Sequence, residues 1–198
     1  MKILVSAFDA FGGEIINPSS LVLEKLKGIN GVTLEKIVVP TVFGKALLKL
    51  REKIDEFKPD AVICPGQAAG RKNITVERVA INLRDCKIPD NENNLITDEK
   101  IKEDGENALF STLDVKAVAD AINKKNIPAA VSYTAGTFVC NDLLYLTLDY
   151  LKNTDTKCAF IHLPCVPEQL PRMPKDTFAL PLDTLVSAIE TALETISK

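Results

Sequence analysis

A chain of 198 residues, 46% of them hydrophobic and 26% charged, is long enough to bury its own core and predicts one globular domain. Its net charge of −3 argues against nucleic-acid binding or a polybasic membrane surface, and no apolar run approaches the ~20 residues of a membrane span. Because Asp9 interrupts the apolar start, this segment predicts a buried strand and not a signal peptide, and we expect a cytoplasmic protein.

The cysteines predict free thiols, which fits a reducing compartment. Their number is odd, and no two have the C-x-x-C spacing. No zinc site is expected either, because His162 and Cys165 have no second pair of ligands clustered with them. The five are Cys64, Cys86, Cys140, Cys158 and Cys165.

The first third of the chain alternates strand and helix signals. Asn17 is a good helix cap, with Pro18 at the first helical position and Gly28 as a stop. This β-α-β-α-β order is typical of a parallel sheet with helices on its faces. The predicted elements are a strand at Lys2–Phe8, a helix from Asn17 to Gly28, a strand at Thr33–Val39, an amphipathic helix from Phe43 to Phe57 and a strand at Ala61–Cys64.

The middle of the chain breaks this alternation. Ile74–Leu83 looks extended, and the polar stretch Ile88–Phe110 predicts an excursion of hairpin and loop at one end of the sheet. The alternation then resumes, and Pro164–Pro181 is expected to be a loop. The remaining elements are a helix near Asp114–Lys125, a strand at Ala129–Tyr133, a helix beginning near Cys140, a strand at Cys158–His162 and a last helix from Leu182 to Ile196.

These elements predict the α/β fold class. We expect a single-domain α/β/α sandwich with a mostly parallel, twisted sheet, helices on both faces, and the hairpin and loop excursion at one end. No linker, repeat or low-complexity segment divides the chain, so residues 1–198 are expected to form one domain.

Cys140 is the first candidate for chemistry. It lies where the strand at Ala129–Tyr133 and a small-residue corner lead into an apolar helix. Free N–H groups and the helix dipole at such a terminus favour the thiolate, which is the nucleophilic form. The alternative is that Cys140 is a small buried hydrophobic residue.

His162 is the only imidazole available to such a nucleophile, since the chain has one histidine. It ends an apolar strand, and functional residues gather at the carboxyl ends of strands in open parallel sheets. A buried structural histidine is the alternative. A third group would orient the imidazole. Glu77 is notable among the 27 acidic residues because it lies in an apolar stretch, although a salt bridge with Arg78 or Arg84 would also account for it.

The glycine-containing segment PGQAAGR follows a strand and invites a phosphate-binding interpretation. It lacks the Lys-Ser/Thr pair of a P-loop, and an extended segment follows it where a helix is needed. A phosphorylase-like transferase acting on small molecules is therefore an alternative with little support.

Six blocks of the sequence, taken in order, resemble the pyrrolidone-carboxylate peptidase (type I pyroglutamyl peptidase) family. They are FDAFGGE with NPS, GQAAGR, ITVERVAIN, IPDN, PAAVSYTAGTFVCN, and FIHLP with PEQ. The resemblance implies a cysteine peptidase that removes N-terminal pyroglutamyl residues from peptides through a thioester acyl-enzyme. It also implies a homotetramer without a cofactor, whose partners are pyroglutamyl peptides as substrates.

The resemblance also assigns roles to residues. The family's triad falls on Glu77, Cys140 and His162. The oxyanion would be held by the Cys140 backbone N–H and by Lys87. The pocket for the lactam ring falls on Phe8, Phe11, Gln67, Phe138 and Val139.

Two positions depart from the family pattern. Lys87 replaces an arginine that usually precedes IPDN, and Cys165 replaces a tyrosine after HLP. The first puts the efficiency of oxyanion stabilisation in question, and the second concerns packing or assembly. A binding or assembly protein with weakened catalysis is therefore a further alternative.

Overall fold

The computed structural model describes residues 1–198 and contains one six-stranded sheet between two layers of helices. The sheet order is β2-β1-β3-β8-β4-β7, and all neighbouring strands are parallel except β8 and β4. The strands are β1 (Lys2–Phe8), β2 (Thr33–Val39), β3 (Ala61–Gln67), β4 (Ile74–Glu77), β5 (Val79–Ile81), β6 (Ala108–Phe110), β7 (Ala129–Ser132) and β8 (Lys157–Leu163).

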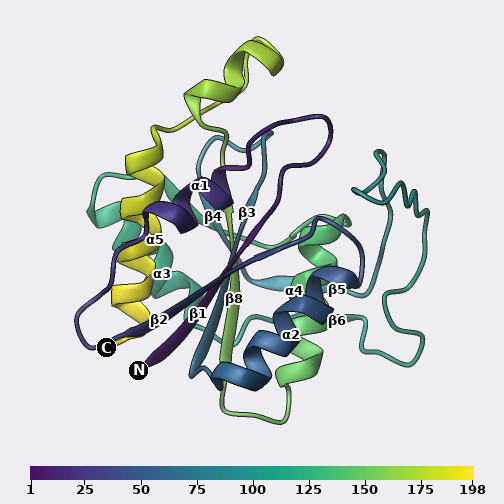
Figure 1. The fold of residues 1–198 in the computed structure, drawn as a ribbon, viewed down its shortest axis with the longest axis horizontal. Helices are drawn as coiled ribbons and strands as arrows, with labels where there is room; N and C mark the ends of the chain where they lie inside the picture. The colour runs from purple at the N-terminus through teal and green to yellow at the C-terminus, as the bar shows by residue number, and fades with distance from the viewer.

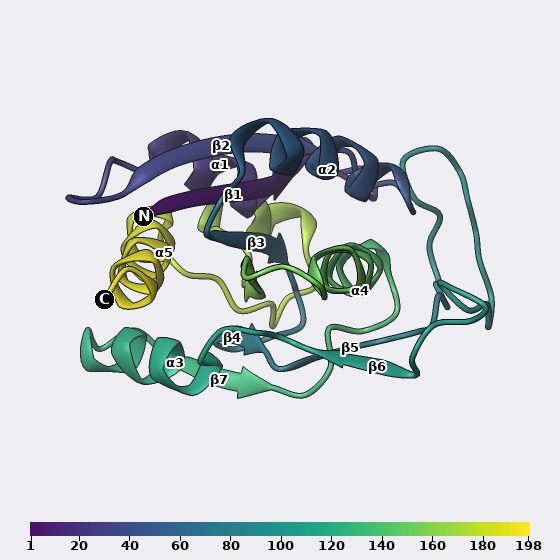
Figure 2. The same ribbon diagram turned by 90° about the horizontal axis from the view of Figure 1, so that it is seen from below.

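Helices cover both faces of the sheet, as predicted. The first layer holds α1, α3 and α5, and the second holds α2 and α4 (Figure 2). None of the helices has the length and apolar character needed to cross a membrane. Their bounds are α1 (Pro18–Lys25), α2 (Lys45–Phe57), α3 (Val115–Lys124), α4 (Val139–Leu151) and α5 (Leu182–Ile196), with a short 3₁₀ helix, η1, at Pro167–Arg172.

Alternating side chains of the strands pack into two hydrophobic cores, one on each face of the sheet. On β1, Ile3 and Val5 pack against the α1/α3/α5 layer, whereas Leu4 and Phe8 pack against the α2/α4 layer. All four are buried, as expected for a strand covered on both faces. The α/β class and the mostly parallel sheet with helices on both faces are therefore confirmed.

Local signals explain several element boundaries. Asn17 caps α1 by accepting a hydrogen bond from the Ser19 N–H, and Pro18 is its first residue. The helix ends at Lys25, three residues before the predicted stop at Gly28. Lys58 closes α2 in the left-handed conformation, immediately before Pro59.

The excursion in the middle of the chain is a separate two-stranded sheet. The extended stretch expected at Ile74–Leu83 breaks at Arg78 into β4, which joins the main sheet, and β5, which pairs with β6. The segment between β5 and β6 runs out from the body of the molecule in Figure 1. The expected loop Pro164–Pro181 also contains η1, at Pro167–Arg172.

Candidate active site

The antiparallel pair β4 and β8 joins a carboxylate to the only imidazole. Thr75 on β4 lies opposite His162 on β8, so Glu77, two residues further along β4, projects from the same side of the sheet. The distance from Glu77 Oε1 to His162 Nδ1 is 2.8 Å, and both side chains are buried. This contact leaves Nε2 as the ring nitrogen that is free to exchange a proton.

The alternative explanation for Glu77, a salt bridge with Arg78 or Arg84, is not what the structure shows. Arg78 instead lies over the ring of Phe110, and Arg84 pairs with another carboxylate. Side chains alternate along a strand, so Arg78 points away from the side that Glu77 occupies. The arginine that contacts Glu77 is Arg71, whose Nη1 lies 2.5 Å from Oε1.

Cys140 is the second residue of α4 and lies over β3. A Cβ built on Gly66 would be 3.2 Å from Cys140 Sγ, and Gly66 is the residue of β3 that pairs with His162. The nucleophile candidate and the imidazole are thus brought to the same place on the sheet.

The route to this meeting differs from the predicted one. Cys140 follows β7, but β4 separates β7 from β8, and β8 runs antiparallel to both. Neighbouring carboxyl ends therefore do not bring Cys140 to His162. The segment from Tyr133 to Phe138 carries the chain from the edge of the sheet back to its centre.

Two buried polar side chains hold the first turn of α4. Asn141 accepts from the Ile81 N–H at 2.9 Å and donates to the Ile81 carbonyl at 2.9 Å. Asp142 accepts from the Gly44 N–H at 2.8 Å and from Arg84 at 2.6 Å. Since these bonds join α4 to β5 and to the start of α2, they fix the position of Cys140.

Cys140 and His162 line a cavity of about 210 Å³. Phe138 lies in its aromatic wall. The centroid of its ring is 5.9 Å from that of Phe11 and 5.4 Å from that of Phe43. A small, largely apolar chamber of this kind suits a compact ring with few polar groups. The lining residues are Phe8, Phe11, Asn17, Thr41, Gln67, Ala68, Arg71, Ala135, Gly136, Thr137, Phe138, Cys140 and His162.

Known proteins resemble this chain over most or all of its length. The family model for pyroglutamyl peptidase matches residues 1–198. The pyrrolidone-carboxylate peptidase of Finegoldia magna is 52% identical over 177 residues, which cover 86% of this chain and 81% of that protein. The pyrrolidone-carboxylate peptidase of a Thermoanaerobacter species is also 52% identical, over 86% of this chain and 85% of that protein.

Solved structures agree with the sequence comparison. Pyroglutamyl peptidase I of Bacillus amyloliquefaciens has a TM-score of 0.93 at 43% identity, covering 99% of this chain and 96% of that one. A mutant pyrrolidone carboxyl peptidase from Pyrococcus furiosus has a TM-score of 0.94 at 36% identity, with coverage of 99% and 98%. The chain belongs to the pyroglutamyl peptidase family. It is an enzyme of the pyroglutamyl-peptidase I type, a cysteine hydrolase.

Family membership therefore favours the predicted peptidase over a phosphorylase-like transferase. The structure also accounts for the PGQAAGR segment without phosphate binding, because its Arg71 is hydrogen-bonded to Glu77 and lines the cavity. No group of three or more His, Cys, Asp or Glu side chains is arranged to hold a metal ion.

Four of the five residues expected at the pocket of this peptidase do line the cavity. They are Phe8, Phe11, Gln67 and Phe138. Val139 does not, because as the first residue of α4 it is fully buried in the α2/α4 core.

Lys87 also lies outside the cavity lining, and its side chain is exposed. Its neighbour Cys86 is buried, with its N–H and Sγ bonded to the backbone of Ile96. Because Cys86 takes the inward position of this segment, Lys87 is turned toward solvent. The structure therefore places Lys87, the expected second oxyanion donor, outside the lining of the cavity.

Burial controls the protonation of the two reactive side chains. It raises the pKa of the Cys140 thiol to about 12, and the charge of Glu77 adds to the rise, whereas Arg71 lowers it. Burial also lowers the pKa of His162 from its usual 6.5, against the effect of its hydrogen bond to Glu77. Both groups are therefore neutral at pH 7. The thiolate expected at the helix terminus is not favoured here, because burial and the neighbouring charge of Glu77 both raise the pKa of the thiol.

Sequence reasoning missed several residues of the cavity. Asn17 was recognised only as a helix cap, although it serves both roles. Thr41 carries no signal of its own, since its place at the cavity depends on how separate loops meet. Arg71 does carry one, because it is a charged residue at the end of the GQAAGR loop, directly after a buried strand.

A buried network fixes Gln67, the polar residue at the end of β3. Gln169 Nε2 donates to Gln67 Oε1 at 3.3 Å, and Gln67 Nε2 lies 3.6 Å from Cys165 Sγ. The residue that departs from the family pattern, Cys165, is thus fully buried and packs against a cavity residue.

Proposed function

We propose that this peptidase removes the N-terminal pyroglutamyl residue of peptides by nucleophilic attack of Cys140, with His162 as proton carrier and Glu77 as its orienting partner. The observation that carries the proposal is a single cavity lined by Cys140 and by a His162 whose Nδ1 is held 2.8 Å from Glu77. This is the arrangement of nucleophile, base and orienting carboxylate that covalent catalysis needs.

The protonation states define the first step. A neutral thiol is a poor nucleophile, so His162 Nε2 takes the Cys140 proton as the sulfur attacks the pyroglutamyl carbonyl carbon. The ring becomes a cation, and Glu77 stabilises it from the Nδ1 side. His162 then gives the proton to the leaving amine, and the C–N bond breaks to leave a thioester on Cys140.

Water completes the cycle. His162 takes a proton from the water molecule that attacks the thioester, the C–S bond breaks, and pyroglutamate leaves as Cys140 recovers its proton. In both steps the carbonyl oxygen becomes an oxyanion. The Cys140 backbone N–H can serve it, because the first N–H groups of a helix have no acceptor within the helix. Lys87, expected as a second donor, would act only at a distance.

The chemistry of the cavity fits a lactam. A pyroglutamyl residue has no free amine, so a site for it needs no carboxylate to bind an ammonium group. Phe8, Phe11 and Phe138 supply apolar walls, and Gln67 supplies an amide for the polar edge of the ring.

The test is release of a fluorogenic amine from matched pyroglutamyl, glutamyl and prolyl conjugates. We expect turnover of the pyroglutamyl conjugate and little or none of the glutamyl conjugate, whose ammonium and carboxylate groups would be desolvated without partners. The prolyl conjugate keeps the ring but replaces the neutral lactam amide with a charged secondary ammonium group, so it tests recognition of the lactam and exclusion of charge together. Comparable rates on the pyroglutamyl and glutamyl conjugates would contradict the assignment of the pocket.

We also propose a homotetrameric, cytoplasmic enzyme. The resemblance to the family supports the assembly, and five free cysteines are compatible with a reducing compartment. Light scattering coupled to size exclusion, with 21.6 kDa as the mass of one chain, measures the assembly directly.

A further inference from the structure

Arg71 connects three parts of the candidate site. It follows β3, and its guanidinium donates to Glu77 Oε1 at 2.5 Å, to the Thr75 hydroxyl and to the Thr134 carbonyl at 2.7 Å. Thr134 belongs to the segment that carries the chain from β7 to Cys140. One side chain therefore fixes both the orienting carboxylate and the approach to the nucleophile.

The positive charge of Arg71 lies beside the buried Glu77 carboxylate. Glu77 is fully buried, its Oε2 has no hydrogen-bond partner, and His162 beside it is neutral at pH 7. A buried carboxylate without a positive partner is costly, and Arg71 supplies that partner. Its side chain is 23% exposed, so the guanidinium also forms part of the cavity wall.

We propose that Arg71 is a positioning residue of this enzyme, which holds Glu77 against His162 and places a permanent positive charge beside the Cys140–His162 pair. The inference rests on the proposed function of that pair. Arginine suits the task because its planar fork binds Glu77 and the Thr134 carbonyl from two nitrogens in a fixed geometry, whereas a lysine offers one compact ammonium group on a flexible stem.

A permanent charge at this place has a consequence for the pH profile. The charged groups acting on His162 are Glu77 and Arg71, and those acting on Cys140 are Glu77, Arg71 and the thiol of Cys64. Arg71 lowers the pKa of both His162 and Cys140. Removing its charge should therefore make both groups bind protons more tightly. The acid limb of the activity profile, which reports His162, should then move to higher pH, and alkylation of Cys140 at a given pH should become slower.

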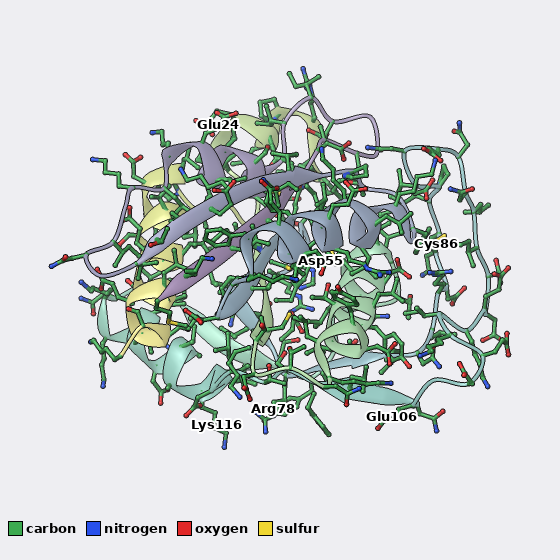
Figure 3. The ribbon with its side chains drawn as sticks, turned by 60° about the horizontal axis from the view of Figure 1, so that its bottom comes forward. Glu24, Asp55, Arg78, Cys86, Glu106 and Lys116 are labelled. Atoms are coloured by element: carbon green, nitrogen blue, oxygen red, sulfur yellow. The ribbon has the colours of Figure 1, made fainter.

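The experiment compares Arg71→Gln and Arg71→Lys with the parent and with Arg78→Gln as control. Arg78 is the same residue type a short way along the chain, but it lies over Phe110 at the margin of the molecule (Figure 3). Two readouts are taken against pH: kcat and KM on the pyroglutamyl conjugate, and the rate of Cys140 alkylation by iodoacetamide. Alkylation is followed at Cys140 by peptide mass spectrometry, with Cys140→Ser as the blank.

For Arg71→Gln we expect kcat to fall about 10- to 100-fold with a smaller change in KM, because a misplaced Glu77 no longer orients His162. The acid limb of kcat and the alkylation profile should both move upward by roughly 0.5 to 2 pH units. Arg71→Lys keeps the charge without the fork, so it should lose kcat with little shift of the limbs. Arg78→Gln should resemble the parent.

The outcomes separate this inference from the proposed function. A folded Arg71→Gln with the acid limb and the alkylation profile of the parent, whatever its kcat, would overturn the electrostatic role, and equal kcat would overturn the positioning role. If Arg71→Gln fails to fold, Arg71→Lys decides: kcat equal to the parent's overturns the proposal. If the parent does not hydrolyse the conjugate, the proposed function fails, and the alkylation profile still tests the charge of Arg71.

Discussion

Replacement of Glu77 by glutamine tests the centre of the proposed mechanism with little change of shape. Oε1 accepts from Arg71 at 2.5 Å and from the Thr75 hydroxyl at 3.1 Å, and it contacts His162 at 2.8 Å. Oε2 has no partner. The amide oxygen of glutamine will therefore take the place of Oε1, and its NH₂ group the unpartnered place. The imidazole keeps an acceptor, but the negative charge is lost.

The magnitude follows from what that charge does. In the free enzyme the Glu77 carboxylate compensates the positive charge of Arg71. Removing one partner of a buried ion pair lowers the free energy of unfolding by about 3–5 kcal/mol. Since Arg71 is 23% exposed and keeps its acceptor, we expect a smaller loss of stability, about 2–3 kcal/mol. In the transition state the Glu77 carboxylate faces a His162 cation at hydrogen-bond distance. Loss of that stabilisation should lower kcat by about 10²- to 10⁴-fold.

The assay pairs kinetics with unfolding. Steady-state kcat and KM on the pyroglutamyl conjugate are measured beside urea denaturation, with Glu56→Gln as the matched control. Glu56 carries the same charge, is 72% exposed and pairs with Lys53, so its loss should leave both quantities near those of the parent. A folded Glu77→Gln with kcat within about threefold of the parent would refute the mechanism and leave Glu77 as a structural ion pair.

Three further substitutions test the rest of the site. Cys140→Ser should abolish turnover without unfolding the chain, whereas serine at each of the other four cysteines should spare turnover, as conjugate hydrolysis and circular dichroism would show. Lys87→Ala should change kcat by less than about threefold, because the side chain is exposed outside the cavity; a loss of tenfold or more would restore an oxyanion role. Gly66→Ala would bring a Cβ within 2.5 Å of the Phe160 ring and 3.2 Å of Cys140 Sγ, so urea unfolding should show a loss of about 1–3 kcal/mol together with reduced kcat.

Much of the fold follows from local patterns in the sequence. The predicted strands at Lys2–Phe8 and Thr33–Val39 have the bounds found in the structure, because apolar runs between clear turn signals define them. Pairing is harder to predict. The short connection from Gln67 to Ile74 leaves no room for a parallel crossover, so it indicates that β4 runs antiparallel to β3. Nothing local says that β8 enters the sheet between these two strands, parallel to β3 and antiparallel to β4. That one antiparallel pair places Glu77 beside His162.

The candidate site divides in the same way. A single histidine and a cysteine at a strand–helix corner can be singled out by residue type alone. Glu77 could be selected only through family resemblance, because its burial and its contact with His162 depend on the antiparallel pair. Arg71 escaped prediction although it lies only six residues before Glu77, because their contact depends on how the loop between β3 and β4 folds.

The loops around the cavity explain why family motifs extend beyond the residues that line it. Asn91 of the IPDN motif donates to Asp9 at 3.1 Å and to the Ala10 carbonyl at 2.8 Å, and Asp9 also accepts from the Thr41 N–H at 2.7 Å. These bonds tie the loop that carries Phe11 to two other segments, so they stabilise one wall of the cavity.

The same contacts give the substitution at Lys87 a structural context. The motif beginning at the next residue supports the wall through Asp90, which is buried and accepts from the Phe43 N–H at 3.0 Å, and through Asn91. Burial alone would raise the pKa of Asp90. Hydrogen bonds from Asn94 and from backbone N–H groups lower it by more than burial raises it, so the pKa of Asp90 lies below its usual value. The segment is therefore anchored by groups other than the exposed Lys87. An arginine could be exchanged for lysine at this position without moving the wall, because neither the anchoring bonds nor the cavity lining involves its side chain.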